Sequence, residues 1–144
     1  MTLSFEHILV PYDVTRTGEK AFNGALQLAK KFESQITVLS CIEKESTWGF
    51  FDTKSNKRNM TKRIKVMQEK ISEREESANK FDIKFNSKVT NCSVASKCIV
   101  SYINSHNVDF IIMGKSSKTS PEKIYHDSTV NFVYNHVHVP MLNI

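Results

Sequence analysis

The stretch around which the chain is organised covers residues 108–130 and reads VDFIIMGKSSKTSPEKIYHDSTV. It begins with the apolar run FIIM at 110–113, which predicts a buried strand. The run ends at Gly114 and leads into a segment rich in Lys, Ser and Thr. In α/β proteins, phosphate groups usually bind where a strand ends in glycine and a hydroxyl-rich loop leads into a helix. We therefore expect this stretch to carry the main binding site.

The length and composition favour one globular domain over residues 1–144. Of the 144 residues, 40% are hydrophobic and 24% are charged, as in proteins with a packed core. No apolar run approaches the roughly 20 residues that cross a bilayer. The first residues lack the basic region and small-residue cleavage site of a signal peptide. We therefore expect a cytoplasmic protein with no membrane partner.

Charge and cysteine spacing argue against two kinds of site. The net charge is +5, and much of the positive charge lies in residues 54–70. Acidic residues follow directly at 69–76, which favours a solvated helix face over nucleic acid as a partner. The cysteines Cys41, Cys92 and Cys98 are odd in number and lack CxxC spacing. This pattern argues against a disulfide framework and a zinc site, so we expect no metal.

Strand and helix patterns alternate along the chain. Apolar or β-branched runs predict strands at 7–13, 35–42, 81–89, 109–114 and 139–144. Apolar residues at helical spacing predict helices from Thr15 or Thr17 to 32, at 60–78, at 93–104 with Ser93 as the N-cap, and from about 128 to 136. Such alternation produces a parallel sheet with helices on both faces. The third predicted strand alternates apolar and polar residues, which is typical of a sheet edge.

Two features of this α/β arrangement bear on function. Ligands bind at the carboxyl ends of strands where the strand order reverses, and those ends here are Asp13, Cys41 with Ile42, and Gly114. The connection at 43–59 is long and contains Trp48, Phe50 and Phe51. Aromatic side chains there indicate a lid or a contact surface, or a loop folded back on the core, and both interpretations stay open.

Four segments, taken in order, carry a resemblance to a known family. HILVPYDVT (7–15), ITVLSCIE (36–43), DFIIMGKSS (109–117) and HDSTVNFVYNHVHVPMLNI (126–144) resemble the universal stress protein (UspA-like) family over nearly the whole chain. The family's typical segments are ILVPVDGS, DLIVMG and GSVSEKVLRHAPCPVLVV. The resemblance implies a three-layer Rossmann-like α/β sandwich with a five-stranded parallel sheet of order 3-2-1-4-5. It also implies a homodimer formed through the C-terminal strand.

The ATP-binding branch of that family has the signature G-x2-G-x9-G-[S/T], which this chain keeps only in part. Gly114 matches the first glycine, Ser117 and Asp127 replace the second and third, and Ser128 matches the hydroxyl position. By the same resemblance, Asp13 lies near the adenosine. The nucleotide-binding residues that we expect are Pro11, Tyr12, Asp13, Thr15, Cys41, Ile42, Met113, Gly114, Lys115, Ser117, Asp127, Ser128 and Thr129.

The two glycine substitutions predict weaker binding of a triphosphate. Glycine lets backbone N–H groups approach phosphate oxygens, and Ser117 keeps a hydroxyl donor in exchange. Asp127 falls at the expected N-cap of the last helix and would repel phosphate, by several kcal/mol in a poorly solvated pair. Lys115, Lys118 and Lys123, or Mg²⁺ bound with a triphosphate, would offset part of this repulsion. We expect AMP to bind better than ATP.

These patterns favour a binding module over an enzyme. No Ser-His-Asp or paired-carboxylate spacing is present, so we expect no catalytic residues. His126, His136 and His138 have no partner at metal-ligand spacing. The first hypothesis is a non-enzymatic adenine-nucleotide-binding module in stress response or signalling, with an unknown protein partner. The alternative is a dimeric interaction scaffold that no longer binds nucleotide.

Overall fold

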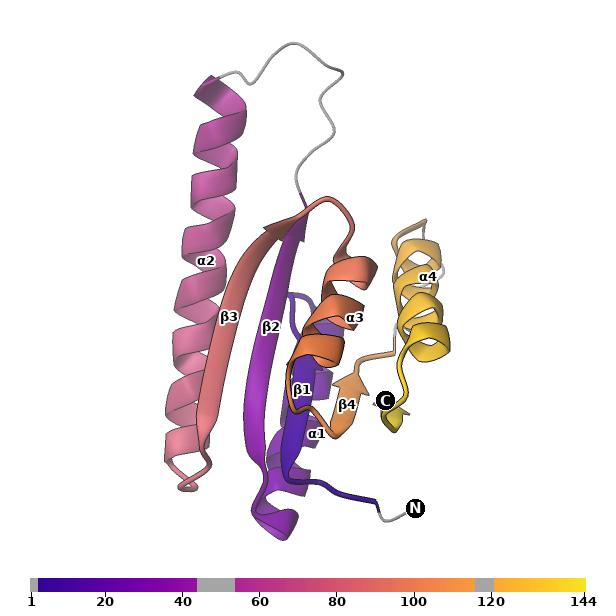
Figure 1. Cartoon of the computed structure of the whole chain (residues 1–144). Coiled ribbons are helices and arrows are strands. Elements are labelled where there is room, and N and C mark those ends of the chain that lie inside the picture. Colours follow the sequence, from indigo (N-terminus) through magenta and orange to yellow (C-terminus); the bar gives the residue numbers. More distant parts are fainter. Residues whose placement is uncertain (1–2, 44–53, 116–120) are drawn as a thin grey trace.

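The computed structural model describes residues 3–43, 54–115 and 121–144. Strands and helices alternate along it (Figure 1). The elements are β1 (His7–Pro11), α1 (Arg16–Phe32), β2 (Gln35–Glu43), α2 (Lys54–Asn79), β3 (Phe85–Cys92), α3 (Ala95–Ser105), β4 (Phe110–Met113), α4 (Pro121–His136) and β5 (Met141–Asn143). Within these segments, no helix is both long and apolar enough to cross a membrane.

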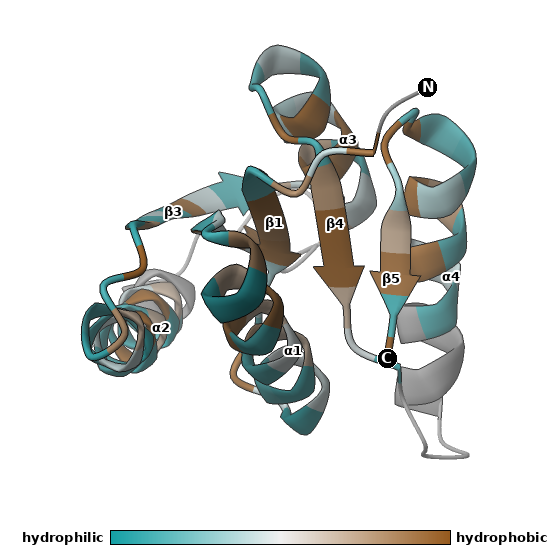
Figure 2. Cartoon of the chain, turned by 90° about the horizontal axis from the view of Figure 1, so that it is seen from below, coloured by the Kyte–Doolittle hydropathy of each residue, from teal (hydrophilic) through white to brown (hydrophobic). Residues whose placement is uncertain are grey.

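The five strands form one parallel sheet in the order β3-β2-β1-β4-β5. This order confirms the one implied by the family resemblance, and β3 lies at an edge as its alternating pattern predicts. Side chains on successive strand residues point to opposite faces, so each strand feeds two cores. Ile8 and Val10 pack towards α1 and α2, whereas Leu9 packs towards α3 and α4. Figure 2 shows apolar residues concentrated on the strands and on the inner sides of the helices.

The starts of α2 and β3 differ by several residues from the sequence-based predictions. Helix α2 begins at Lys54 instead of Met60, because a charged segment continues the helix without adding to its apolar stripe. Strand β3 begins at Phe85 instead of Phe81, because the chain turns at Asp82, where φ is 56°. Residues 44–53 lie outside the described part of the chain, so the lid and contact-surface interpretations stay predictions.

The prediction for the start of the last helix is wrong, and so is the N-cap role of Asp127. Helix α4 begins at Pro121, which places Asp127 six residues inside it. Proline is favoured at the first helical position because its φ is fixed near the helical value and its missing N–H is not needed there. The polar residues between Pro121 and Asp127 form helix without an apolar stripe, so periodicity did not reveal them.

The N-terminus of α3 is stabilised by a residue distant in the sequence. Ser93 was expected to cap this helix, but the N-cap is Val94 and makes no side-chain capping bond. Glu43 Oε1, at the end of β2, instead accepts a hydrogen bond from the Ala95 backbone N–H at 2.8 Å. A carboxylate there also complements the positive end of the helix dipole. The pairing of β2 with β3 therefore places the acid that caps α3.

A partly buried chain of polar side chains joins Tyr12, just after β1, to both helices on one face of the sheet. Tyr12, 3% exposed, donates its hydroxyl hydrogen bond to Glu19 of α1. Glu19 Oε2 lies 3.1 Å from Arg74 Nη1 of α2. Burial is the largest cause that raises the pKa of Tyr12 above its ordinary value, and the bond to Glu19 is the next.

Replacement of Tyr12 by phenylalanine should have an effect that reverses with pH. Near neutral pH, Tyr12→Phe should lower the free energy of unfolding by about 1 kcal/mol through loss of the hydrogen bond. A raised folded-state pKa means that the tyrosine contribution is complete below the unfolded-state pKa near 10 and is lost above it. The native chain should therefore lose about 1.4 kcal/mol per pH unit relative to the variant in that range.

Urea unfolding between about pH 8 and pH 11 measures this difference. Tyr134→Phe is the matched control, because Tyr134 is exposed and its hydroxyl is not buried. A constant difference between the native chain and Tyr12→Phe over this pH range would contradict the assignment.

Candidate functional site

The carboxyl ends of β1 and β4 form the point at which the strand order reverses. β1 pairs with β2 on one side and with β4 on the other. The chain leaves β1 to one side to build β2 and β3, and it reaches β4 and β5 on the other side. In open parallel sheets, ligands bind in the crevice at such a point. Asp13 follows β1 and Gly114 follows β4, as the sequence predicts for the site.

The first turn of α1 packs closely against the end of β4, and against the loop after β1, through two glycines. A Cβ at Gly114 would overlap the carbonyl oxygen of Thr17 and lie only 2.9 Å from the Thr17 Cα. A Cβ at Gly18 would overlap the carbonyl oxygen of Asp13 and lie 3.0 Å from its backbone nitrogen. Only glycine permits such close approach of two backbone segments. Gly114 therefore has a packing role at this corner, whether or not a phosphate binds.

The loop after β1 holds Asp13 near the carboxyl end of that strand. Asp13 Oδ1 accepts hydrogen bonds from the Thr15 backbone N–H, at 3.0 Å, and from the Thr15 hydroxyl. The Thr15 hydroxyl in turn lies 2.7 Å from that of Thr17. Within the described chain, the carboxylate is held through Oδ1 alone, and its side chain is exposed. Oδ2 of Asp13 therefore remains positioned to accept a hydrogen bond from a ligand.

Two lysines carry positive charge to the same corner. Lys20 Nζ of α1 donates to the Lys115 carbonyl oxygen at 3.3 Å, and both side chains are exposed. The Lys115 backbone N–H donates to Ile144, which continues the pairing of β4 with β5. Lys20 was not among the expected site residues, because the family signature contains no position on the first helix. The sequence feature that could have identified Lys20 is its spacing of three residues from Thr17, which places both residues on one side of α1.

The remaining expected residues at the ends of β1, β2 and β4 contribute mainly through their backbone. Tyr12 N–H donates to Leu39 O at 2.9 Å, and the Tyr12 carbonyl accepts from Ser40 Oγ at 2.8 Å. Ile42 and Met113 have buried side chains on opposite faces of the sheet. Pro11, at the end of β1, is partly exposed. These residues therefore offer few free polar groups at the carboxyl ends of the strands.

The hydroxyl end of the family signature lies within a helix. Ser128 and Thr129 follow Asp127 beyond the first turn of α4. Backbone N–H groups past the first four helical positions bond to carbonyl groups within the helix. These residues therefore cannot present free N–H groups to a phosphate, and only their side chains remain available. Ser117 lies outside the described residues.

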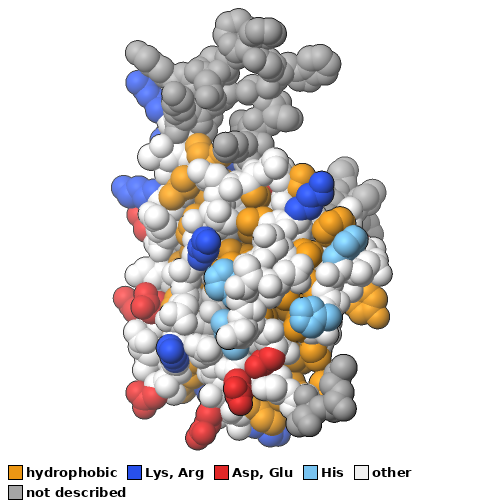
Figure 3. Space-filling view, in the orientation of Figure 1, with side chains coloured by type: hydrophobic (Ala, Val, Ile, Leu, Met, Phe, Trp, Pro, Cys, Tyr) orange, Lys and Arg blue, Asp and Glu red, His pale blue; other side chains and the backbone are white. Residues whose placement is uncertain are grey.

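A hollow of about 560 Å³ lies at the other end of the sheet. It is lined in part by Glu6 before β1, by Ser34 and Gln35 at the start of β2, and by Ile83 and Lys84 before β3. These residues lie at the amino ends of the strands, whereas ligands in open parallel sheets bind beyond the carboxyl ends. We therefore do not assign the nucleotide to this hollow. On the face in Figure 3, Lys and Arg side chains stand apart and form no continuous basic patch.

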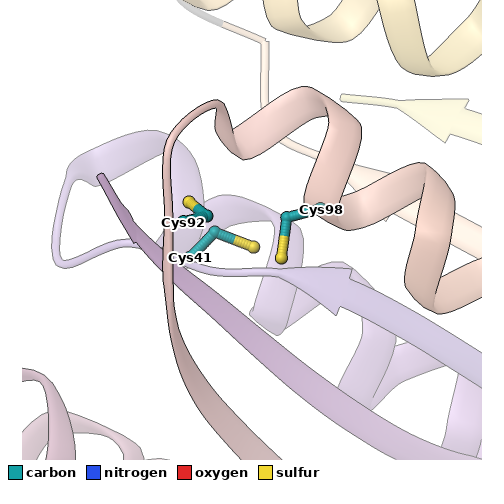
Figure 4. Close-up of side chains that lie close together, drawn as sticks. All are labelled: Cys41, Cys92 and Cys98. Atoms are coloured by element: carbon teal, nitrogen blue, oxygen red, sulfur yellow. The ribbon is translucent and has the colours of Figure 1, made fainter. Parts of the chain in front are cut away.

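The three cysteines lie close together in the fold, although their spacing in the sequence did not predict this. Cys41 of β2, Cys92 of β3 and Cys98 of α3 place their Sγ atoms within 4.8 Å of one another (Figure 4). Burial raises the pKa of the Cys92 thiol to about 11 and raises that of Cys41, to which Cys98 also contributes. His136 and His138 join no such group among the described residues. The order of the elements could have revealed this convergence, because β2 and β3 are neighbours in the sheet and α3 follows β3.

Substitution of Gly114 should destabilise the fold strongly. Gly114→Ala places a methyl group on the Thr17 backbone, which cannot move without shifting α1, so we expect a loss of about 2 kcal/mol or more. Gly24→Ala is the matched control, because its Cβ would meet only Cδ1 of Ile144, the end of a flexible side chain. Alanine also favours the helix there by about 1 kcal/mol. Equal stability of the two variants in urea unfolding would contradict this packing role.

Comparison with known proteins agrees with the fold. The sequence profile of the universal stress protein family matches residues 4–144. The sequence has no significant match among curated proteins. The structure is similar to universal stress protein UspA from Lactobacillus plantarum, with a TM-score of 0.82, 17% identity and 99% of each chain covered.

Two other similar structures are complexes with a nucleotide. One is a universal stress protein in complex with cAMP, with a TM-score of 0.69, 11% identity, and 98% of this chain and 97% of that chain covered. The other is an Arabidopsis thaliana universal stress protein family protein with AMP bound, with a TM-score of 0.69, 11% identity, and 96% and 90% covered. Because the family profile spans almost all of the sequence, the chain belongs to the universal stress protein family.

Proposed function

We propose that this protein is a non-enzymatic binding module for adenine nucleotides and that it prefers AMP to ATP. The observation that supports the proposal is the placement of Asp13 and Gly114 after β1 and β4, where the strand order reverses. The similar structures described with AMP and with cAMP support an adenine nucleotide as the ligand. A bound nucleotide would signal by ordering the loops around the crevice and so changing affinity for a protein partner.

The adenosine half of the ligand has suitable partners beside β1 and β2. The exposed Oδ2 of Asp13 would accept a hydrogen bond from a ribose hydroxyl, and an ionised acceptor makes such a bond stronger. Backbone groups at Cys41 and Ile42 would meet the adenine ring, as the family resemblance implies. Thr15 holds Asp13 in place, so the acceptor is positioned before the ligand arrives.

The phosphate half of the site is suited to one phosphate better than to three. Lys20 and Lys115 supply positive charge beside Gly114. The early start of α4 commits the N–H groups of Asp127, Ser128 and Thr129 to the helix, so the cradle for the outer phosphates is reduced. Asp127 adds a like charge on that side, which Mg²⁺ would offset only for a triphosphate.

The competing function is a dimeric scaffold that no longer binds nucleotide. The position of Asp127 inside α4 favours this alternative, because helix has replaced the family's glycine at the phosphate loop. The two functions differ in whether the Asp13 corner binds any nucleotide at millimolar concentration.

Calorimetric titration with AMP, ADP and ATP tests the proposal. We expect AMP to bind most tightly and ATP most weakly. Asp13→Asn should weaken AMP binding at least about tenfold, since a charge-assisted hydrogen bond contributes roughly 1.5–3 kcal/mol. Asparagine keeps the acceptor for Thr15, so the loop should retain its shape.

Asp82→Asn is the matched control for this titration. Asp82 is exposed beside the hollow at the opposite end of the sheet, and asparagine tolerates its positive φ. Asp127→Asn should reduce the difference in binding affinity between AMP and ATP, because it removes a negative charge near the outer phosphates. Absence of binding by all three nucleotides would reject the nucleotide module in favour of the scaffold, and equal loss in Asp13→Asn and Asp82→Asn would reject the Asp13 site.

We further propose that two copies associate through β5, as the family resemblance implies. β5 is an edge strand of the sheet, and its Leu142 side chain remains 37% exposed. An edge strand presents unpaired backbone groups that a second copy can pair with. A two-fold arrangement would set Leu142 of each copy near the same interface.

Sedimentation equilibrium measures this association. Leu142→Lys should shift the native dimer to monomer, because a lysine at a symmetric interface brings two like charges together. Val66→Lys on α2 is the control, since Val66 is an exposed apolar residue away from β5. A dimer that persists unchanged in Leu142→Lys would argue against pairing through β5.

A further inference from the structure

We propose that Cys41, Cys92 and Cys98 form a binding site for one monovalent copper ion. Their three Sγ atoms come from β2, β3 and α3 and lie within 4.8 Å of one another. Figure 4 shows the side chains gathered in the space between the two strands and the helix. No disulfide joins them, so all three are available as thiols.

The fold places the three ligands independently of any ion. In the register of the sheet, Cys41 pairs with Thr90, and Cys92 lies two residues further along β3, on the same face as Thr90. Cys98 reaches that face from α3, whose start is held by the bond between Glu43 and Ala95. The ligands are therefore supported by strand pairing and by a capped helix, which limits the reorganisation that binding requires.

The spacing suits three-coordinate binding. With metal–sulfur bonds of about 2.3 Å, the length found at zinc thiolates, a trigonal arrangement separates the sulfur atoms by about 4.0 Å. The observed separations, all within 4.8 Å, approach this value. Changes in χ1 and small backbone shifts are enough to bring the thiols into a trigonal plane.

The composition of the cluster selects the ion. Metal-binding side chains in proteins are mainly those of His, Cys, Asp and Glu. Among the described residues, the cluster of such side chains has three members, and all three are cysteines. Zinc almost always takes four ligands in structural sites, so here it would need water as the fourth. The nearby carboxylate of Glu43 already accepts the Ala95 N–H. Thiolate ligands favour soft ions, and monovalent copper is satisfied by three of them.

Binding must displace protons from the thiols. Because burial holds the pKa of Cys92 near 11 and raises that of Cys41, both are protonated at neutral pH. The balanced step is Cu⁺ plus three thiols giving a copper tris-thiolate of charge −2 and three protons, with no change in oxidation state. Each cysteine is only partly buried, so solvent can screen part of that charge. Apparent affinity should therefore rise with pH.

Titration of the reduced native protein with Cu⁺ under nitrogen, against a chromophoric copper chelator, tests the site. We expect one copper per chain and, by X-ray absorption, three sulfur neighbours at about 2.3 Å. Cys41→Ser, Cys92→Ser and Cys98→Ser should each lower copper affinity at least tenfold. His136→Asn is the control, because it removes an exposed alternative ligand on α4 and should leave copper binding unchanged.

The absorption spectrum of the native protein keeps the test valid if a cysteine variant fails to fold. Nitrogen or oxygen neighbours, only two sulfur neighbours, or undiminished affinity in Cys92→Ser would each overturn the proposal. So would retention of Zn²⁺ in the presence of excess Cu⁺. The readout is the metal itself, so the result does not depend on whether the Asp13 corner binds a nucleotide.

Discussion

The contact between Gly114 and the Thr17 carbonyl is the constraint on which the candidate site depends. It sets the first turn of α1 against the end of β4, and no residue with a Cβ fits there without moving the helix. The same contact brings the segment after Asp13 next to Gly114, which Lys115 follows. Lys20 then reaches the Lys115 carbonyl across the junction. A single close approach of backbone thus gathers the acid and the two cations at the point where the strand order reverses.

The sequence predicts the order and type of the elements well because most of them have an apolar period. The buried stripe of α1 and the β-branched residues of β2 are clear examples. The boundary errors occur where polar residues extend an element. Neither Lys54 nor Pro121 starts an apolar stripe, yet both begin helices. Periodicity reports burial on one face, and it is silent where a helix extends into solvent.

The site was predictable only in part, for a related reason. Asp13 and Gly114 follow strands, so their convergence follows from a parallel sheet. The helical position of Asp127 did not follow, since the start of α4 was misplaced by seven residues, from Pro121 to Ser128. The convergence of the cysteines was not predicted, because spacing rules describe ligands within one segment. Cys41, Cys92 and Cys98 come from three elements, and only the register of β2 with β3 reveals that they meet.

The central claim is that the corner between β1 and β4 binds an adenine nucleotide with one phosphate. An amide chemical-shift map of the ¹⁵N-labelled protein titrated with AMP tests it most directly. The account predicts saturable shifts at Asp13, Thr15, Gly114 and Lys115, the residues of the two loops that meet there. Shifts confined to the hollow around Glu6, or no shifts at saturating AMP, would contradict it.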